Sequence, residues 1–340
     1  MSEQPALLVT GAAGFVGSHV VRDILRTDEF ADHHVVALDD LSGGFESNVP
    51  DDTRVTFVKG DIGDEPLIAG LFDEYRFEYV YHLAAYAAEG LSHFIRMFNY
   101  RNNLIGSMNL LNNAVKHECR RFVFTSSIAV YGAAQTPMTE STVPQPEDPY
   151  GISKYAVELD LAAAHEMFGL DYVIFRPHNV YGEYQNIGDR YRNVVGIFMN
   201  QILQDLPMTV FGDGEQQRAF SYIGDISPQI ARAPIVKAAV NQTFNIGADR
   251  PYSVNELARQ VGIALGRPDH PVRHLDARNE VEIAFSDHSH CRTVFGTQQD
   301  TTLEEGLHRT AEWVRTVGSR ESSIFGSIEI EKNLPPSWRV

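Results

Sequence analysis

Two hydrophobic patterns alternate along the first half of the chain. Short apolar runs have the length of strands buried on both faces, and the longer segments between them have the spacing of amphipathic helices. Strands are predicted at residues 6–10, 35–38, 55–58, 79–83, 122–125 and 172–175, and helices at 14–26, 66–75, 103–117 and 149–168. Strands that alternate with helices form a parallel sheet covered on both sides. We therefore expect a doubly wound α/β domain.

This alternation ends after about residue 180. Residues 182–193 are polar and aromatic without a regular period, and residues 209–215 hold two glycines two positions apart, which predicts a turn or a short hairpin. Ser253, followed three residues later by Glu256, forms a capping box that predicts the start of a helix. We interpret this part as a smaller C-terminal α/β lobe that binds a substrate. The predicted division assigns residues 1–180 and a returning segment at about 219–248 to the first domain, 181–218 and 249–320 to the lobe, and 321–340 to a tail in which Trp338 makes a docking contact.

Charge and composition exclude several classes of function. The chain has 28 Lys plus Arg against 45 Asp plus Glu, a formal charge of −17, whereas nucleic acids and anionic membranes select basic surfaces. No apolar run approaches the roughly 18 residues of a membrane span, and the N-terminus lacks the pattern of a signal peptide. Cys119 and Cys291 lie too far apart in sequence to indicate a disulfide framework or a cysteine zinc site. These features indicate a soluble, cytoplasmic protein.

A glycine-rich turn follows the first predicted strand. Gly11, Gly14 and Gly17 give a G-x-x-G-x-x-G pattern that also includes Phe15 and Val16. Glycines allow a tight turn and a close approach of the backbone to a pyrophosphate, and the following helix turns its N-terminus toward the phosphates. Between a strand and a helix, this pattern predicts a dinucleotide site of the Rossmann type.

An acidic residue at the end of the second predicted strand indicates which dinucleotide is bound. Asp39 lies 22 residues after Gly17, where a carboxylate accepts hydrogen bonds from the adenosine ribose and repels a 2′-phosphate. No arginine follows closely, so NAD is preferred over NADP. The alternative is that Asp39 and Asp40 only open a loop. In the dinucleotide interpretation, Asp61 and Ile62, in the turn after the third strand, lie beside the adenine.

A tyrosine and a lysine four residues apart begin the helix predicted at 149–168. Tyr150 and Lys154 share one helical face, so the ammonium group can approach the phenol and favour its ionised form. With five lysines in the chain, chance predicts about 0.2 such pairs. Ser127, after the fifth strand, can bond a substrate oxygen and pass its proton to Tyr150. The alternatives are a surface contact for the pair and a turn-forming role for the serine.

With these motifs, residues 125–132, 176–182 and 210–215 resemble the extended short-chain dehydrogenase/reductases. The likeness is to the NAD-dependent nucleotide-sugar epimerase/dehydratase family, and within it to UDP-glucose and UDP-glucuronate 4-epimerases, over roughly residues 6–315. It implies a catalytic triad of Ser127, Tyr150 and Lys154 and a homodimer built from helices of the first domain. It also implies nicotinamide-side contacts from Leu83, Ala84, Ala85, Asn103 and Pro177, and UDP-sugar contacts from Asn179, Asn193, Val210, Phe211, Arg218 and Arg278. Tyr86 and Ala87 stand where some members carry a lysine, so contacts in that loop differ from theirs.

The resemblance implies that C4 of a UDP-sugar is inverted through a transient 4-keto intermediate. Dehydratases of this fold carry an acidic pair directly after the catalytic hydroxyl residue, and related decarboxylases keep a glutamate there. Here these positions are Ile128 and Ala129, which can neither protonate a leaving group nor remove a proton. We therefore expect no elimination or decarboxylation as the main reaction. The alternatives are a dehydratase or decarboxylase of the same fold and a non-catalytic NAD-sensing protein.

The sugar is predicted from two arginines ahead of Asn193. Arg190 and Arg192 place guanidinium groups beside the sugar pocket, and a buried hexuronate carboxylate needs a cation. We expect Arg192 to bind that carboxylate, which favours UDP-glucuronate/UDP-galacturonate interconversion over UDP-glucose/UDP-galactose. The alternative is that both arginines pair with Asp189 or Glu183 on the surface of the lobe.

One cluster contains metal-ligating residue types. Asp287, His288, His290 and Cys291 are close in sequence, but no second cluster completes a site. We expect no metal.

Overall fold

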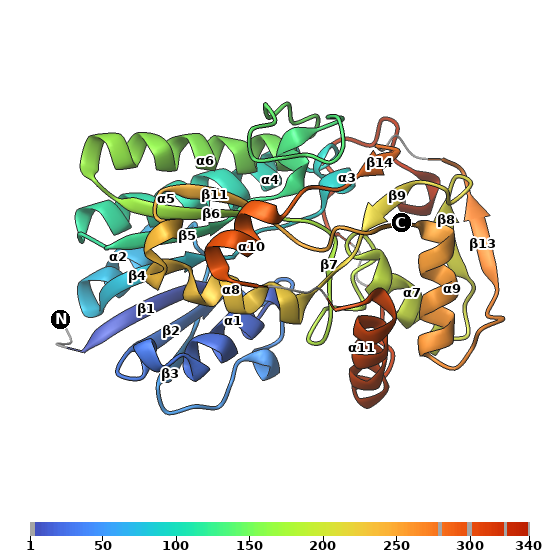
Figure 1. The fold of residues 1–340 in the computed structure, drawn as a ribbon, viewed down its shortest axis with the longest axis horizontal. Coiled ribbons are helices and arrows are strands. Elements are labelled where there is room, and N and C mark those ends of the chain that lie inside the picture. The colour runs from blue at the N-terminus through green and yellow to red at the C-terminus, as the bar shows by residue number, and fades with distance from the viewer. Residues whose placement is uncertain (1–3, 278–280, 298–300, 323–324, 339–340) are drawn as a thin grey trace.

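The computed structural model describes residues 4–277, 281–297, 301–322 and 325–338. Seven strands form one sheet in the order β11-β6-β5-β4-β1-β2-β3 (Figure 1), and each neighbouring pair is parallel. Their bounds are β1 Pro5–Thr10, β2 His34–Asp39, β3 Val55–Lys59, β4 Arg76–His82, β5 Arg121–Thr125, β6 Asp171–Pro177 and β11 Gln242–Ile246. The six strands predicted from apolar runs are all present, and the doubly wound α/β prediction is confirmed.

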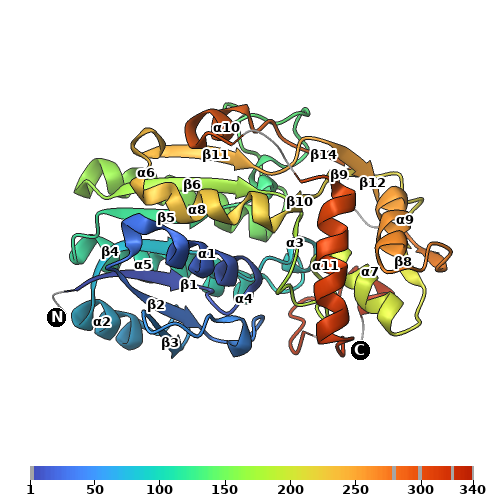
Figure 2. The same ribbon diagram turned by 60° about the horizontal axis from the view of Figure 1, so that its bottom comes forward.

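Helices cover both faces of the sheet (Figures 1 and 2). On one face α1, α8 and α10 pack through side chains such as Val21, Ile230 and Phe295. On the other, α2, α5 and α6 pack through a second apolar cluster that includes Leu110 and Leu161. The helices of this domain are α1 Phe15–Arg26, α2 Glu65–Glu74, α3 Glu89–Ser92, α4 Arg96–Tyr100, α5 Gly106–Lys116, α6 Pro149–Phe168, α8 Ser227–Arg232 and α10 Ser289–Phe295. Because α10 packs here, it belongs to the core of the first domain, although the predicted division placed residues 249–320 in the second lobe.

The second lobe has its own core, in which Phe198, Leu257 and Leu307 are fully buried. Its helices are α7 Val194–Leu203, α9 Val254–Ala264 and α11 Leu303–Val317, and the short strands outside the main sheet are β7 Val180–Tyr181, β8 Met208–Phe211, β9 Gln217–Ala219, β10 Ser221–Tyr222, β12 Pro251–Ser253, β13 Val272–Leu275 and β14 Ile283–Ala284. The helix start predicted at Ser253 is confirmed, since Ser253 accepts a hydrogen bond from Glu256 N at the start of α9, but the Glu256 carboxylate bonds Arg259 and Gln260 and does not complete a capping box. Of the turn or short hairpin predicted at 209–215, the structure has a turn at Gly212 and Asp213 but no hairpin, because β8 pairs with β13, and β9 pairs with β12 and β14.

Helix α6 begins and ends where the sequence predicts. Asp148 caps it by accepting a hydrogen bond from Gly151 N at 3.0 Å, and Pro149 occupies the first turn, where a missing N–H costs nothing. Gly169 ends it in the left-handed conformation at φ +76°. These signals fix the positions of Tyr150 and Lys154 in its first two turns.

Candidate active site

A cleft of about 1840 Å³ opens where the carboxyl ends of the parallel strands face the second lobe. Pockets for one small molecule measure roughly 300–1,000 Å³, so this cleft has room for two ligands side by side. Its lining includes Gly11 and Asp39 from the first domain, Tyr150 from α6, and Asn193 and Phe211 from the second lobe. Most of the residues predicted for cofactor and substrate therefore border one space.

The glycine turn leaves no room for side chains. A Cβ on Gly17 would lie 2.0 Å from Gly11 O, and one on Gly11, at φ +70°, would lie 2.8 Å from Ala84 N. Gly14 is the N-cap of α1 and provides no side-chain cap, so the first N–H groups of this twelve-residue helix face the cleft without one. Phe15 and Val16 line the cleft beside them. This is the cradle that a pyrophosphate needs.

Asp39 lies at the end of β2 and is 7% exposed. Its carboxylate accepts hydrogen bonds from Ala13 N at 3.0 Å and Leu41 N at 2.8 Å, while burial raises the pKa of the group. Each oxygen retains a further acceptor position, and the residue lines the cleft together with Asp61 and Ile62. The glycine cradle and the remaining acceptor positions of Asp39 thus fit NAD, and Asp39 would hold its adenosine ribose.

A buried polar network holds the turn that follows β4. His82 bonds Thr10 Oγ1 through Nδ1 at 2.9 Å and Ser107 Oγ through Nε2 at 2.7 Å. Thr10 Oγ1 accepts from Leu83 N and Ala84 N, both at 3.2 Å. Burial lowers the pKa of His82 to about 3, so the ring is neutral. The network, which the sequence interpretation missed, positions Leu83, Ala84 and Ala85 on the cleft wall.

Asn103 does not reach the cleft. Its amide group bonds the backbone N and O of Tyr86, at 2.8 and 3.1 Å, and Asn99 Oδ1 at 2.7 Å, and the residue is 1% exposed. The expected nicotinamide-side contact is therefore replaced by support of the Tyr86 loop. The Asn103 amide is occupied by these contacts, and the neighbouring Asn102, in the π-helical turn Arg101–Ile105, lines the cleft instead.

Ser127, Tyr150 and Lys154 meet at the base of the cleft. Lys154 is 2% exposed, donates to Thr125 O at 2.8 Å and lies 5.9 Å from the centre of the Tyr150 ring. Burial lowers the pKa of Lys154 to about 7. Burial also raises the pKa of Tyr150, and a hydrogen bond with Ser127 and the charge of Arg192 act in the opposite direction. Chemically, the arrangement is a phenol whose ionisation depends on nearby positive charge.

The turn after Ser127 contains no acid. Ser127 Oγ accepts a hydrogen bond from Ala129 N at 3.1 Å, which caps the short helical turn Ile128–Tyr131. Ile128 and Ala129 line the cleft directly beside the serine. The two positions that would need carboxyl groups for elimination are thus apolar in the sequence and face the site in the structure.

The predicted substrate residues border the far side of the cleft. Asn179 and Asn193 both adopt left-handed backbone conformations, at φ +42° and +63°, and Val210, Phe211 and Pro177 also line the cleft. Arg218 lines it too, but its guanidinium donates to the carbonyl groups of Gln217, Val281 and Glu282. Arg278 lies outside the described residues, so the expected pair of diphosphate-binding arginines is described only through Arg218.

Arg192 is inside the cleft but is not unpaired. It forms an ion pair with Asp189, with Nε donating to Oδ2 at 2.6 Å, and its guanidinium lies 4.7 Å from the centre of the Tyr86 ring. Its Nη2 also lies 3.0 Å from the point where a Cβ on Gly43 would stand, beside the loop that follows Asp39. Arg192 therefore pairs with Asp189, as in the alternative interpretation, but does so within the cleft, and its contact with a sugar carboxylate stays a prediction.

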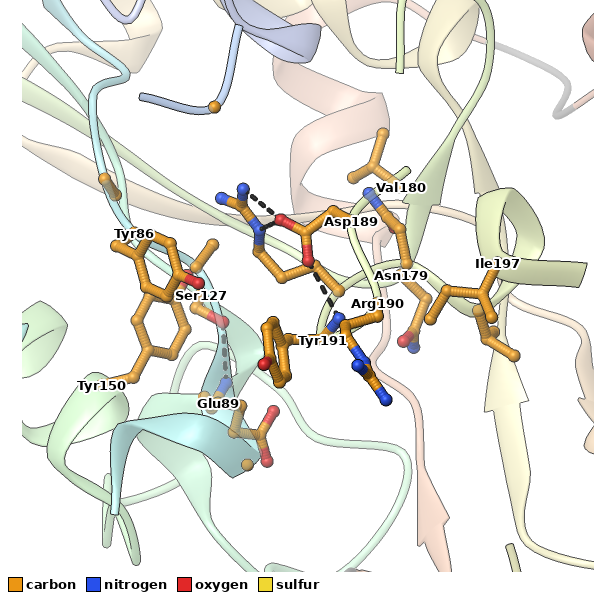
Figure 3. A pocket seen from close by; sticks show the side chains of 18 of the residues that line it. Tyr86, Glu89, Ser127, Tyr150, Asn179, Val180, Asp189, Arg190, Tyr191 and Ile197 are labelled. Atoms are coloured by element: carbon orange, nitrogen blue, oxygen red, sulfur yellow. Dashed lines mark hydrogen bonds and ion pairs between the residues drawn. The ribbon is translucent and has the colours of Figure 1, made fainter. Parts of the chain in front are cut away.

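The cleft lining includes Glu89 and Tyr191, which the sequence interpretation did not assign to the site, and Tyr86, which it named only as part of a loop with altered contacts. Figure 3 shows them with Ser127 and Tyr150 on one side of the space, and Asn179, Val180 and Ile197 on the other. They lie in loops or in the four-residue helix α3, where no hydrophobic period marks a position as facing inward.

The cluster at 287–291 takes part in a different contact. His288 Nε2 lies 2.9 Å from His178 Nε2, and its Nδ1 lies 2.6 Å from Asp249. Over the described ranges, no three His, Cys, Asp or Glu side chains are grouped so that they could hold a metal ion. In the same part of the chain, no helix is both long and apolar enough to cross a membrane.

Comparison with known proteins relates this site to others. The family model described as "NAD dependent epimerase/dehydratase family" matches residues 7–247. The chain is 34% identical over 313 residues to the UDP-glucose 4-epimerase of Mycolicibacterium smegmatis, covering 91% of this chain and 98% of that protein. Among solved structures, the UDP-glucose 4-epimerase of Thermotoga maritima with UDP-glucose matches at 33% identity and a TM-score of 0.83, covering 92% of this chain and 99% of that one. The UDP-glucuronic acid 4-epimerase of Bacillus cereus, in complex with UDP-glucuronic acid and NAD, matches at 27% identity, the same TM-score and the same coverage.

Proposed function

The chain belongs to the NAD-dependent epimerase/dehydratase family, and we propose that it is a UDP-sugar 4-epimerase whose substrates are UDP-glucose and UDP-galactose. The observation that carries the proposal is the meeting of Ser127, Tyr150 and Lys154 in a cleft where Ile128 and Ala129 stand beside the serine. Tyr150 and Ser127 can exchange a proton with one sugar hydroxyl. Elimination would also need acidic side chains at positions 128 and 129, and both residues there are apolar.

The residues act on the proton of the sugar 4-hydroxyl. Tyr150 accepts this proton, directly or through Ser127. It returns the proton after the keto sugar has rotated and presents its opposite face to the cofactor. Lys154 lies 5.9 Å from the centre of the Tyr150 ring, and in its protonated form it lowers the cost of ionising a buried phenol. Bound NAD supplies the acceptor and the donor of the hydride at C4. Because the same hydroxyl is regenerated with inverted configuration, no net oxidation results.

Charge pairing supports a neutral hexose over a hexuronate. Arg192, on which the uronate expectation rested, already neutralises Asp189. Glu89 adds a further carboxylate to the lining, and its charge raises the pKa of Tyr150. A sugar carboxylate would have to compete with Asp189 for the guanidinium, whereas a 6-hydroxyl needs only a hydrogen-bonding partner. The names of the two UDP-glucose 4-epimerases point in the same direction.

The test follows the anomeric proton signals of the sugar nucleotide during incubation with purified protein. UDP-galactose and UDP-glucose should each give the same two-component mixture. If UDP-glucuronate is converted at a higher kcat/KM than UDP-glucose, the preferred substrate is the uronate and the hexose proposal is wrong. A 4-keto-6-deoxy product would show a dehydratase, and the absence of any product with either sugar class would contradict an enzyme of this type.

We further propose that the protein is a homodimer that pairs through α5 and α6. Ile105 beside α5 and Ile152 and Leu159 on α6 are 58%, 40% and 55% exposed. Ile152 and Leu159 are seven residues apart and therefore lie on one face of their helix. Large apolar side chains exposed on two adjacent helices suit a self-complementary helical interface.

A further inference from the structure

The C-terminal residues 325–338 form an irregular segment that ends in a short helical turn at Pro336–Trp338, here called the strap, and it contacts both lobes. It follows α11 and lies beyond residue 315, where the resemblance to the family ends. Eight of the residues that line the cleft belong to the strap, between Ile330 and Trp338. The strap is therefore a wall of the cleft rather than a separate tail.

The strap is attached to the first domain at two points. The Glu329 carboxylate accepts from Met97 N and Phe98 N, both at 2.8 Å, at the start of α4. Backbone N–H groups of Glu329 and Ile330 donate to Phe94 O at 2.8 and 3.2 Å. Leu334 and Trp338, each 4% exposed, are buried in one apolar cluster with Ala88, Leu91 and Ile95. A carboxylate on helix N–H groups and a buried indole together resist detachment.

The strap is also attached to the loop that carries Arg190 and Tyr191. The Tyr191 hydroxyl accepts from Phe325 N at 3.2 Å, and its ring packs edge-on against Trp338 at 5.4 Å between centres. The Arg190 guanidinium donates to Ser337 O. Because Tyr191 stands inside the pocket near Ser127 and Tyr150 (Figure 3), these contacts fix a residue of the reacting end of the cleft.

A third contact joins the strap to Tyr86. The Phe325 ring packs at 5.3 Å from Tyr86 and at 4.9 Å from Phe98, measured between ring centres. Tyr86 in turn lies under the Arg192 guanidinium. The strap thus supports both aromatic side chains, Tyr86 and Tyr191, that border the space next to Tyr150.

We propose that the strap encloses the sugar during the interval in which it is a 4-keto intermediate. The inference rests on the proposed epimerase function, because only that reaction requires an oxidised sugar to turn over without leaving. Loss of the keto sugar at this stage would leave two electrons on the cofactor and a proton on the protein, and the enzyme would stop. A wall anchored on both lobes prevents that loss while leaving the nucleotide end of the cleft unchanged.

The experiment uses the full chain with Trp338→Ala and, separately, Glu329→Ala. Trp338→Phe keeps an aromatic ring in the cluster, and Glu331→Ala removes a neighbouring, exposed carboxylate of the same type. Detachment of the strap is measured without substrate, as the rate of tryptic cleavage after the exposed Lys332. Retention is measured during turnover of UDP-galactose, as keto sugar trapped by borohydride in the ultrafiltrate and as fluorescence of reduced nicotinamide left on the protein.

We expect faster cleavage in both alanine variants and about a tenfold fall in the number of turnovers before the enzyme stops, with keto sugar in the filtrate. Trp338→Phe and Glu331→Ala should resemble the parent. The proposal would be overturned if the strap detaches but the variants retain the keto sugar as well as the parent does. It would also be overturned if the strap resists tryptic cleavage in both alanine variants. A parent that converts no UDP-sugar would contradict the proposed function itself, a failure that the cleavage assay separates from the others.

Discussion

Arg192 and Asp189 form an ion pair within the cleft, with Arg192 Nε 2.6 Å from Asp189 Oδ2. Asp189 is 6% exposed and also accepts from Tyr191 N at 2.9 Å, so its carboxylate is fixed on two sides. A buried ion pair of this kind has no net charge and therefore does not favour a charged ligand. If either partner is removed, the remaining buried charge favours a ligand of opposite charge. The sugar specificity therefore depends on the pair rather than on the arginine alone.

Asp189→Asn should shift specificity toward an acidic sugar. The amide oxygen keeps the bond from Tyr191 N, but the guanidinium loses its counter-charge and becomes available to a hexuronate carboxylate. The ratio of kcat/KM for UDP-glucuronate to that for UDP-glucose should rise about tenfold, the value of one charge-assisted hydrogen bond. The double variant Asp189→Asn/Arg192→Leu should return to the ratio of the parent. An unchanged ratio in the single variant would show that Arg192 does not face the sugar.

Tyr150→Phe should abolish epimerisation without affecting the fold. The hydroxyl is the only part removed, and general acid–base groups contribute about 10²–10⁴ to the rate, so kcat should fall by about 10³. Ser127→Ala should cost less, about 10², because Tyr150 can still reach the 4-hydroxyl directly. Tyr155→Phe, on the same helix but absent from the cleft lining, is the matched control. Steady-state kinetics with UDP-galactose check this, and a Tyr150→Phe variant with near-normal kcat would remove the proposed base.

The elements that local chemistry specifies were predicted well. Strands buried on both faces stand out as apolar runs, and α6 is bounded by Asp148, Pro149 and Gly169, whose capping roles do not depend on the rest of the fold. The pairing of strands was less predictable. The segment 209–215 was expected to form a turn or a short hairpin; the turn is present, but the partner of β8 is β13, which begins more than 60 residues later, and no local pattern encodes that choice.

The missed parts of the site depend on tertiary contacts. Asn103 lies in a π-helical turn, and its amide is held by contacts with Tyr86 and Asn99 that no local sequence pattern specifies. The sequence of the strap shows no regular hydrophobic period. Its position depends on contacts of Glu329 with α4 and of Trp338 with the α3 region. The Trp338 side chain was the only signal of this docking that the sequence offered.

Asp39→Asn should weaken the discrimination between NAD and NADP. In the parent, the buried carboxylate opposes a 2′-phosphate, so NAD should bind at least about 100-fold more tightly. The amide keeps the size of the side chain but removes the repulsion, which should reduce the difference about tenfold. Titration calorimetry on cofactor-free protein measures both constants. Equal affinities in the parent would show that Asp39 only opens the loop.

Leu159→Glu should produce a monomer if α6 forms the proposed dimer interface. The substitution places a charge in the centre of an apolar face, while in a monomer the side chain stays in water and the fold is unaffected. Light scattering after gel filtration gives the mass directly. Leu206→Glu, at a residue 50% exposed in the second lobe, is the control and should leave the dimer intact. A parent that elutes as a monomer would contradict the interface.

Lys154→Met should inactivate the protein and at the same time stabilise it. Burial lowers the pKa of Lys154 from 10.5 to about 7, so between these values the unfolded chain binds more protons than the folded one. Stability must then rise with pH from about 7 to 10.5 in the parent, and the lysine costs most at the lower end of this range. Methionine removes the cost, so the free energy of unfolding at pH 8 should increase by about 1–3 kcal/mol in cofactor-free protein, and the pH slope should flatten. Urea unfolding at several pH values checks both effects, with the exposed Lys59→Met as the control. A loss of stability at pH 8 would mean that the bond from Lys154 to Thr125 O outweighs the cost of burying the charge.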